Sequence, residues 1–448
     1  MRARCLLIAF WMGGLLCGGV SAVEFEDMLE RAAEQDLRVR KALLSLERQK
    51  IVFDKQAAQG LSLSLSSGGP RYTLDASGLF DSPPSVTHNA DMAVSMSLGI
   101  GDPLNSSLSL SVSTSTDFQD IPSLSASLSY TQPLNALLGW RPKTVQELQE
   151  QVTLDRAVIG IYLQKVAVKK EVVAQLKNVA SLQLRLLEIE ETTQNINESV
   201  EQAKMLGTYK KGSYQATSWD HSLQNLKEEQ EQYQTELDHA MTTLSRTGSD
   251  PNALPPVPEA DLQVPTLGEQ DKNTQVYLLK QDIAVAEAKR KEIDFSAYPD
   301  LSVSASLNVT SLSLTPSFSF SWKLFDNGVL RHTKAEQDKA VEILKLDLDQ
   351  ARASFGTSVS AMTFSIAGIE RRRNSLAREQ TLLELEIKQN SDQLAKGIVT
   401  SAQHTRQSRK LAYKQARLVL RQNTLKLDTY SLYLDGLRLI TPVVPIIH

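Results

Sequence analysis

Two stretches of this chain, 61–133 and 300–322, alternate between apolar residues and serine with a period of two. Side chains on a β-strand point alternately to opposite faces of the sheet, so this period predicts strands with one aliphatic face and one small hydroxyl face. The second stretch contains two such runs, on either side of a short turn near Thr310. The first stretch contains four runs, at 61–66, 94–100, 108–113 and 124–130.

The second stretch has no ionisable side chain between Leu301 and Trp322. A soluble sheet normally carries charged side chains on its water-facing side, whereas a transmembrane barrel needs an apolar outer face and a wet inner face. Strands of about ten residues suit a tilted crossing of a bilayer. Because lipid does not tolerate open strand edges, several chains would have to pool their strands. The alternative is a soluble β-domain with a serine-rich surface.

Very long helices are predicted at 142–206 and 329–395, because each range carries a sustained heptad repeat of apolar residues. At 1.5 Å per residue, each helix would be a rod on the order of 100 Å long. A third repeat at 399–436 indicates a helix that packs against the second rod. The repeat is also typical of a coiled-coil fibre. Its positions are Val145, Val152, Ile159, Val166, Val173, Ala180 and Leu187, then Val341, Leu348, Phe355, Met362, Ile369, Leu376 and Leu383, then Leu411, Leu418, Leu425 and Leu432.

The chain divides into two halves with the same order of elements, which are a helix, a serine-rich segment, a very long helix, a glycine turn and another helix. We expect a first repeat at 23–246, a proline-rich equatorial linker at 247–272 and a second repeat at 273–448. The linker holds five prolines, which lack an amide donor, so we expect it to be extended rather than helical. The remaining helices are predicted at 25–58, 214–246 and 270–296.

The first 22 residues predict a secretory signal peptide, with a basic start and an apolar stretch too short to span a bilayer. Small residues place the cleavage between Ala22 and Val23. Lipidation of Cys17 is the alternative. Both cysteines, Cys5 and Cys17, precede the cleavage site, so we expect neither disulfides nor thiolate chemistry in the mature chain.

The net charge and the positions of the histidines argue against nucleic-acid binding and metal sites. The 48 basic and 52 acidic residues give a net charge of −4, which offers no general attraction to nucleic acid. The six histidines are scattered and none has the spacing of a metal ligand set. The basic run Arg371–Arg373 would spread around a helix and is expected to be a solvated face. We therefore expect no catalytic residue, no metal and no cofactor.

Several short motifs recur in both halves. The second half has Tyr-Pro-Asp-Leu-Ser-Val-Ser at 298–304 and Trp-Lys-Leu-Phe-Asp-Asn-Gly at 322–328, and the first half has Gln-Pro-Leu-Asn at 132–135. Lys-Gly-Ser at 211–213 and Lys-Gly-Ile at 396–398 interrupt the helical patterns. In this order the chain resembles the TolC-like outer-membrane efflux proteins, the outer membrane factors. The junctions where chain would pass between helix and strand are then Pro133, Pro299, Trp322 and Gly328.

The resemblance implies a mixed α/β membrane protein, in which long helical hairpins form a periplasmic tunnel and antiparallel strands contribute to a shared transmembrane β-barrel. It implies a homotrimer in the outer membrane with a periplasmic extension. Its partners would be a periplasmic adaptor protein, an inner-membrane pump or ABC transporter, and outer-membrane lipid. The function implied is the passive exit duct of a tripartite efflux or type I secretion system, and not an enzyme. The alternative function is a periplasmic coiled-coil scaffold or envelope structural protein with soluble β-segments.

The resemblance also assigns the glycine turns to the tips of the helical hairpins, where an adaptor would dock. The alternative is that they are simple helix-hairpin turns. Gly212 and Gly397 can adopt the positive φ that a sharp reversal requires. Ser213, Thr217, Thr400 and Ser401 can cap the helices that follow. The expected docking residues are Lys210, Lys211, Gly212, Ser213, Tyr214, Lys396, Gly397 and Ile398.

The chain departs from the family pattern in two places. The first β-segment is much longer than the second, so the first half contributes either an added hairpin, with four strands in place of two, or a large extracellular loop. The family's aspartates after the second tip are missing. The matching positions are Ala402 and Thr405, flanked by His404 and Arg406, so a carboxylate ring at the pore constriction is not expected.

Overall fold

A computed structural model describes most of the chain. The described residues are 21–58, 61–75, 87–100, 107–116, 123–133, 143–246, 257–260, 262, 264–296, 298, 300–308, 312–322 and 328–440. Most of the predicted signal peptide, the proline cluster of the linker and the junction residue Pro299 lie outside the described residues.

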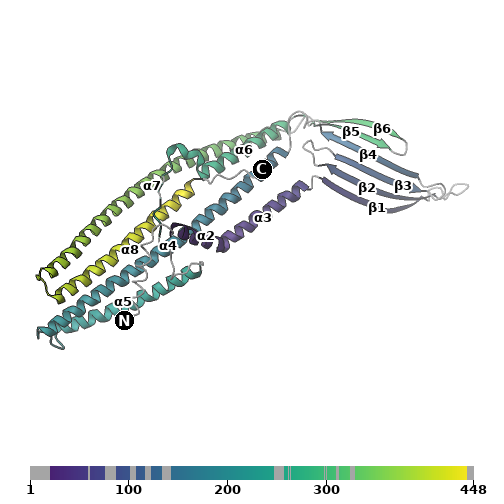
Figure 1. Cartoon of the computed structure of the whole chain (residues 1–448). Helices are drawn as coiled ribbons and strands as arrows, with labels where there is room; N and C mark the ends of the chain where they lie inside the picture. Colours follow the sequence, from purple (N-terminus) through teal and green to yellow (C-terminus); the bar gives the residue numbers. More distant parts are fainter. Residues whose placement is uncertain are drawn as a thin grey trace, which may run out of the picture. The chain divides into compact units, whose positions relative to one another are not determined.

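Helices account for most of the described residues (Figure 1). Helix α4 has 63 residues and α7 has 67, in agreement with the two very long helices predicted from the heptad repeats. The predicted partner helix at 399–436 is α8. The helices are α2 (Ser21–Gln35), α3 (Leu37–Ala58), α4 (Lys143–Met205), α5 (Tyr214–Arg246), α6 (Thr274–Ser296), α7 (Val329–Ala395) and α8 (Ser401–Leu439).

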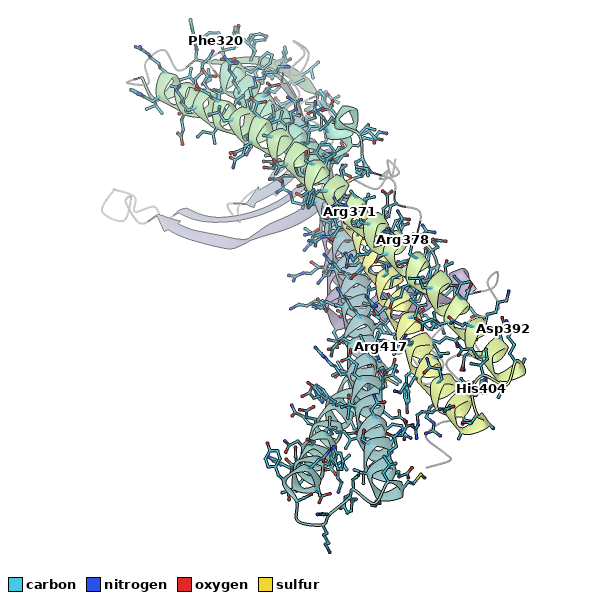
Figure 2. The ribbon with its side chains drawn as sticks, turned by 90° about the vertical axis from the view of Figure 1, so that its left-hand side faces the viewer. Phe320, Arg371, Arg378, Asp392, His404 and Arg417 are labelled. Carbon is cyan, nitrogen blue, oxygen red and sulfur yellow. The ribbon has the colours of Figure 1, made fainter. Side chains whose placement is uncertain are left out.

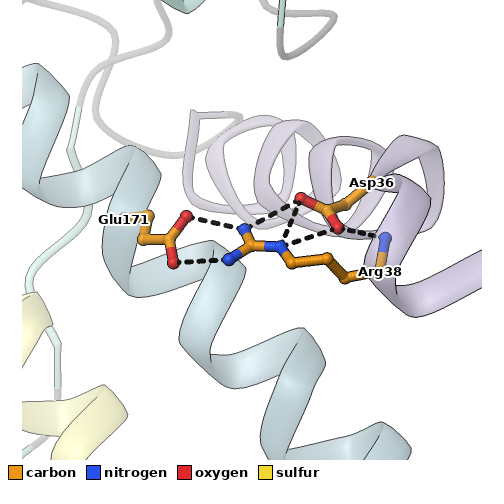
Figure 3. Close-up of polar contacts among 3 residues, drawn as sticks. All are labelled: Asp36, Arg38 and Glu171. Atoms are coloured by element: carbon orange, nitrogen blue, oxygen red, sulfur yellow. Dashed lines mark hydrogen bonds and ion pairs between the residues drawn. The ribbon is translucent and has the colours of Figure 1, made fainter. Parts of the chain in front are cut away.

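The helix predicted over 25–58 is in fact two helices, α2 and α3, separated at Asp36. The backbone N–H of Arg38 donates to the Asp36 carboxylate at 2.7 Å, as expected of an aspartate that caps the start of a helix. The Arg38 guanidinium also contacts Asp36, and it donates to both carboxylate oxygens of Glu171 on α4, at 3.0 and 2.7 Å (Figure 3). The capping aspartate is the physical reason why the prediction of one continuous helix was wrong.

The linker contains a helical turn that the prediction of an extended segment did not include. Residues Leu267–Lys272 form a 3₁₀ helix, η3, whose start is capped by Thr266 and Glu269. Upstream of this turn, Val257 and Ala260 pack against the core, and Glu259 forms an ion pair with Arg373 of α7. Arg373, one of the three arginines of the basic run, therefore contacts the linker through an ion pair.

Six antiparallel strands form one sheet in sequence order (Figure 1). Four of them come from the first half of the chain, so the additional residues there form a hairpin of the sheet, and the alternative of a large loop in place of the strands was wrong. The strands are β1 (Leu61–Asp75), β2 (Thr87–Ile100), β3 (Ser107–Thr116), β4 (Ser123–Pro133), β5 (Asp300–Asn308) and β6 (Ser313–Ser321).

The chain forms two compact units. The first, made of 1–43, 158–277 and 351–448, contains the main core, where Phe25 packs edge-on against Tyr430 with ring centroids 5.0 Å apart. A second cluster of Leu376, Leu383, Leu411 and Leu418 joins α7 to α8. The second unit, made of 44–157 and 278–350, contains the sheet.

Burial follows the predicted heptads closely. Val145, Leu348, Leu425 and Leu432 are half-buried. All the other predicted heptad positions are buried. Burial of one stripe per helix supplies most of the stability that a long helix cannot obtain from its own hydrogen bonds.

Candidate functional site

The serine faces of the six strands lie in register across the whole sheet. One row runs through Ser64, Ser97, Ser109, Ser129, Ser306 and Thr315. The row on one side of it runs through Ser66, Ser95, Ser111, Ser127, Asn308 and Ser313. The row on the other side runs through Ser62, Gly99, Ser107, Thr131, Ser304 and Ser317. Every position in the three rows is Ser or Thr except Gly99 and Asn308, so the face is a continuous band of small polar residues.

The apolar residues are in register in the same way on the opposite face. One row is Leu65, Met96, Leu110, Leu128, Leu307 and Leu314. The neighbouring row is Leu63, Leu98, Leu108, Tyr130, Ala305 and Pro316. The register keeps the serines on one face and the apolar residues on the other, since a slip of one residue would move every side chain of a strand to the opposite face.

Strand β6 shows both faces at the level of side chains. Its apolar residues Phe318 and Phe320 are 65% and 59% exposed. On the other face, the hydroxyl oxygens of Ser304 and Ser317 are 2.5 Å apart across the β5–β6 pair. An uncovered aromatic face opposite a hydroxyl face suits a sheet that lies between lipid and water.

Acidic, basic and histidine residues in the six described strands lie near the strand ends. They are Arg71, Asp75, His88, Asp91 and Asp300. Arg71 and Asp91 are register partners on the serine face, beyond a bulge that follows Gly68. The central rows of the sheet are therefore free of charge on both faces.

The described junction residues lie at strand and helix ends. Pro133 is the last residue of β4, and Trp322, which is 51% exposed, directly follows β6. Gly328 has a φ of +81° and directly precedes α7. Their role as passages between helix and strand remains a prediction.

The first predicted tip joins α4 to α5. Gly212 has a φ of +81°, in the left-handed region that the turn was expected to require. Ser213 caps α5, because its hydroxyl accepts from the backbone N–H of Ala216 at 3.3 Å. Lys210, Lys211 and Tyr214 are exposed, and Tyr214 is 91% exposed.

The second predicted tip joins α7 to α8. Gly397 has a φ of +67°, and Ile398 beside it is 67% exposed. Thr400 and Gln403 form a capping box at the start of α8, in which each side chain binds the other residue's backbone N–H. Lys396 is exposed as well. Both tips thus present a capped turn with at least one large exposed side chain and at least one lysine.

The predicted constriction residues occupy the first turns of α8. Ala402 and Thr405 are exposed, and His404 is half-buried (Figure 2). Arg406 is not free, because its Nε lies 3.3 Å from Glu198 on α4. The guanidinium at this position is therefore already bound to a carboxylate within the chain.

Ion pairs between α4 and α8 are a feature that the sequence analysis missed. Toward the tips, Glu198 binds both Arg406 and Arg409, and Glu191 binds Arg417. Figure 2 labels Arg417 on α8, beside α4. Farther from the tips the signs reverse, with Lys170 bound to Asp435 and Lys177 to Asp428, each at 2.6 Å.

The reversal of charge fixes both the direction and the register of α8 against α4. The residues of α4 in these pairs are 170, 177, 191 and 198, which keep the heptad spacing. A slid or inverted α8 would bring like charges together, which is unfavourable. The sequence signal was the change from lysine-rich to glutamate-rich composition along α4.

A polar layer marks the tip end of the α7–α8 hairpin. Asn390 and His404 occupy positions where the heptads would otherwise continue with leucine. Asn390 is 6% exposed and donates to the Ser408 hydroxyl at 2.9 Å. A buried asparagine at such a position costs stability but specifies register.

Other site chemistry is limited in the part of the chain that is described. No group of three His, Cys, Asp or Glu residues there is placed to hold a metal ion. A polar hollow of about 570 Å³ between α4 and α5 is lined by Gln175, Asn178, Leu182, Glu236 and His239, among others. Within the described residues, no helix is both long and apolar enough to cross a membrane.

Solved structures of bacterial membrane proteins share this architecture. VceC, an outer-membrane protein of Vibrio cholerae, matches with a TM-score of 0.56 and 12% identity, over 93% of this chain and 95% of VceC. The fold is that of the TolC-like outer-membrane channels. The outer-membrane channel CmeC of Campylobacter jejuni shares this TolC-like fold with a TM-score of 0.54 and 9% identity, over 92% of this chain and 84% of CmeC.

The outer-membrane channel OprN gives a TM-score of 0.54 at 14% identity, over 91% of this chain and 89% of OprN. These matches extend over nearly the whole length of each chain, so one TolC-like fold accounts for the helices and the sheet together. No family model and no curated protein matches the sequence.

Proposed function

We propose that the chain is one subunit of a trimeric outer-membrane exit duct with a periplasmic extension. The duct would serve a tripartite efflux or type I secretion system as a passive conduit and would catalyse no reaction. The observation that carries this proposal is the sheet, in which a face of apolar rows, exposed along β6, lies opposite three rows of uncharged small polar residues. A lipid-facing wall around a water-filled lumen needs these two faces.

Assembly of several subunits follows from the edges of the sheet. Strands β1 and β6 are its first and last strands, and among the described strands of a single chain each has a partner on one side only. Six strands are fewer than the eight of the smallest membrane barrels, and open edges are not tolerated in lipid. The number three comes from the likeness to the TolC-like proteins.

The tips are the proposed docking site for a periplasmic adaptor, which would connect the duct to an inner-membrane pump or ABC transporter. Exposed Tyr214 and Ile398 offer apolar anchors, and Lys210, Lys211 and Lys396 surround them with positive charge. Large exposed side chains in a polar rim are typical of interface centres.

The first turns of α8 are the proposed narrow end of the duct. With Arg406 and Arg409 both bound to Glu198, widening this end would require α8 to separate from α4 and to break their ion pairs. The constriction near Ala402, His404 and Thr405 would then be held by neutral contacts and by these pairs, and not by a carboxylate ring.

Membrane extraction and mass measurement test the duct directly. An integral trimer should resist carbonate and high salt, should require detergent for release, and should have the mass of three chains in mild detergent. Release by carbonate alone would favour the alternative of a periplasmic scaffold with soluble β-segments. A monomer in mild detergent would overturn the trimer.

Substitution at the tip glycines tests the docking site. Valine at Gly212 or Gly397 meets open space but must adopt a left-handed φ, which costs about 1–2 kcal/mol. Gly212→Val and Gly397→Val should therefore distort the turn and abolish export while insertion and trimerisation stay intact. Gly368→Ala is the matched control, because it adds a side chain within α7 where nothing lies within 4 Å. Normal export by both tip variants would exclude the tips as the docking site.

A further inference from the structure

The width of the barrel follows from the number of strands that each chain supplies. If three chains close one barrel, as the proposed function requires, a six-stranded sheet from each gives eighteen strands. Barrel diameter grows roughly in proportion to strand number, and barrels of 16–18 strands enclose an aqueous channel. With strands about 4.8 Å apart and tilted by about 40°, eighteen strands enclose a cylinder about 36 Å wide between backbones.

The side chains that would line this cylinder are small. Along the three hydroxyl rows, each position is Ser, Thr, Gly or Asn, and none of them extends far from the backbone. Acidic, basic and histidine residues of the described strands lie outside these rows, near the strand ends. Along these three rows the lumen would have neither bulky groups to narrow it nor fixed charges to select ions, and the charges of the hydroxyl face, such as Arg71 and Asp91, lie nearer the strand ends.

We propose that the barrel is an eighteen-stranded, hydroxyl-lined pore that admits bulky hydrated cargo of either charge. Such cargo includes polypeptide with helical structure, since a helix with its side chains is about 10–12 Å wide. The added β2–β3 hairpin supplies the extra width. Selection of cargo by charge would then have to take place away from the three hydroxyl rows.

Cysteine labelling from outside intact cells tests the proposal, because the described residues contain no cysteine of their own. Ser129→Cys places a thiol in the central hydroxyl row, and Leu128→Cys places one in the adjacent apolar row as the matched control. A small membrane-impermeant maleimide should label Ser129→Cys and not Leu128→Cys. Equal labelling, or labelling of neither, would overturn the proposed duct itself.

Width is then measured with neutral polymer maleimides of increasing hydrodynamic diameter on Ser129→Cys. Removing residues 87–122 deletes β2 and β3 and leaves β1 to pair with β4, which preserves the parity of the hydroxyl rows. The trimer would then have twelve strands and a cylinder about 24 Å wide. We expect the size cut-off of this shortened chain to fall to about two-thirds of that of the full chain or below, because the side chains take the same width from both cylinders.

Each result on width bears on the proposal. If the full chain excludes polymers wider than about 20 Å but accepts the small maleimide, the wide pore is wrong while the duct stands. If the shortened chain does not insert, the number of subunits in the complex and the size cut-off of the full chain still test the eighteen-stranded pore. A complex of two chains would give twelve strands and would also overturn the eighteen-stranded pore.

Charge is tested with cationic and anionic thiosulfonates of equal size on Ser129→Cys, each normalised to its rate with free cysteine. The two normalised rates should agree within about twofold, because no fixed charge lies in the rows. Adding Ser109→Asp, the register partner of Ser129, should favour the cationic reagent by severalfold and shows that the assay detects charge. A similar preference without Ser109→Asp would overturn the proposal that the hydroxyl rows admit cargo of either charge.

Discussion

The sheet and the α7–α8 hairpin are both built on strict periods, but they place charge in opposite ways. In the hairpin, the heptad stripe is buried and its flanks are paired, as in Arg421–Glu379 and Lys414–Glu386. In the sheet, the central rows have no charge, and the aromatic face of β6 is bare. Water on every side would favour the first pattern, whereas the two different solvents of the proposed duct would favour the second.

The strongest effect on assembly is expected from a charge placed on the apolar face of the sheet. Phe320→Arg should prevent or strongly impair insertion, because an arginine near the midplane of a bilayer costs about 2–4 kcal/mol. Ser319→Arg, one residue away on the hydroxyl face, should insert nearly normally. Insertion of both variants is measured in outer membranes by the heat-modifiable electrophoretic mobility of the folded trimer. Equal impairment by both substitutions would mean that the faces do not meet different solvents.

A similar pair of variants sharpens the comparison within the hairpin. Leu418 is 4% exposed between α7 and α8. Replacing it with alanine should lower the free energy of unfolding by about 2–5 kcal/mol, because the change leaves a cavity. Leu382 is 62% exposed in a single chain, so replacing it with alanine should lower the free energy of unfolding by less than about 1 kcal/mol. Chemical denaturation followed by circular dichroism gives both values. A large loss at Leu382 would reveal that assembly covers this side of α7.

Periodicity explains what the sequence could predict of the fold and where it failed. Heptads and serine alternation depend on local burial, so they located the two very long helices and all six strands. The break at Asp36 was missed, because one capping residue interrupts an otherwise helical pattern. The register of the hydroxyl rows was also out of reach, since it depends on pairings between strands far apart in the chain, such as Ser129 with Ser306.

In the candidate site, too, local features could be predicted and long-range contacts could not. The turn at Gly212 and Gly397 could be predicted, because a positive φ at a helix reversal has a local sequence signal. The partner of Arg406 could not, because Glu198 lies on another hairpin and is brought close only by the packing of α8 against α4. Local chemistry was therefore visible in the sequence, and charge pairing between distant helices was not.

Removing a buried carboxylate tests whether the α4–α8 pairs hold the helices together. Glu198 is 13% exposed and binds two arginines, so Glu198→Gln should cost roughly 2 kcal/mol and leave both guanidiniums without their counter-charge. The exposed pair of Glu379 and Arg421 provides the control, and Glu379→Gln should cost less than about 1 kcal/mol. Denaturant midpoints measured in parallel compare the two. Similar losses would show that burial at Glu198 does not matter.

The smallest effect concerns pH, to which the helices should respond and the central rows of the sheet should not. Hydrogen bonds from Arg38 hold the pKa of Asp36 below its ordinary value of 3.8. Burial raises the pKa of Glu30, but Lys165 and Lys169 outweigh burial, and this pKa is lowered as well. A lowered carboxyl pKa contributes stability that is present above the ordinary value and is lost as the pH falls through the folded value.

Acid should therefore weaken the helical unit before it affects the strand rows. Asp36→Asn should destabilise the protein by less than about 1 kcal/mol at pH 7, because Arg38 is half exposed and water screens the pair. The difference between Asp36→Asn and the parent chain should shrink as the pH falls below the ordinary pKa of the carboxyl, since protonation removes the same charge. Circular dichroism of the helices across an acid titration provides the measurement. A difference that stays constant down to pH values well below that pKa would mean that Asp36 acts only as a neutral cap of α3, and that its charge contributes nothing to the junction with α2.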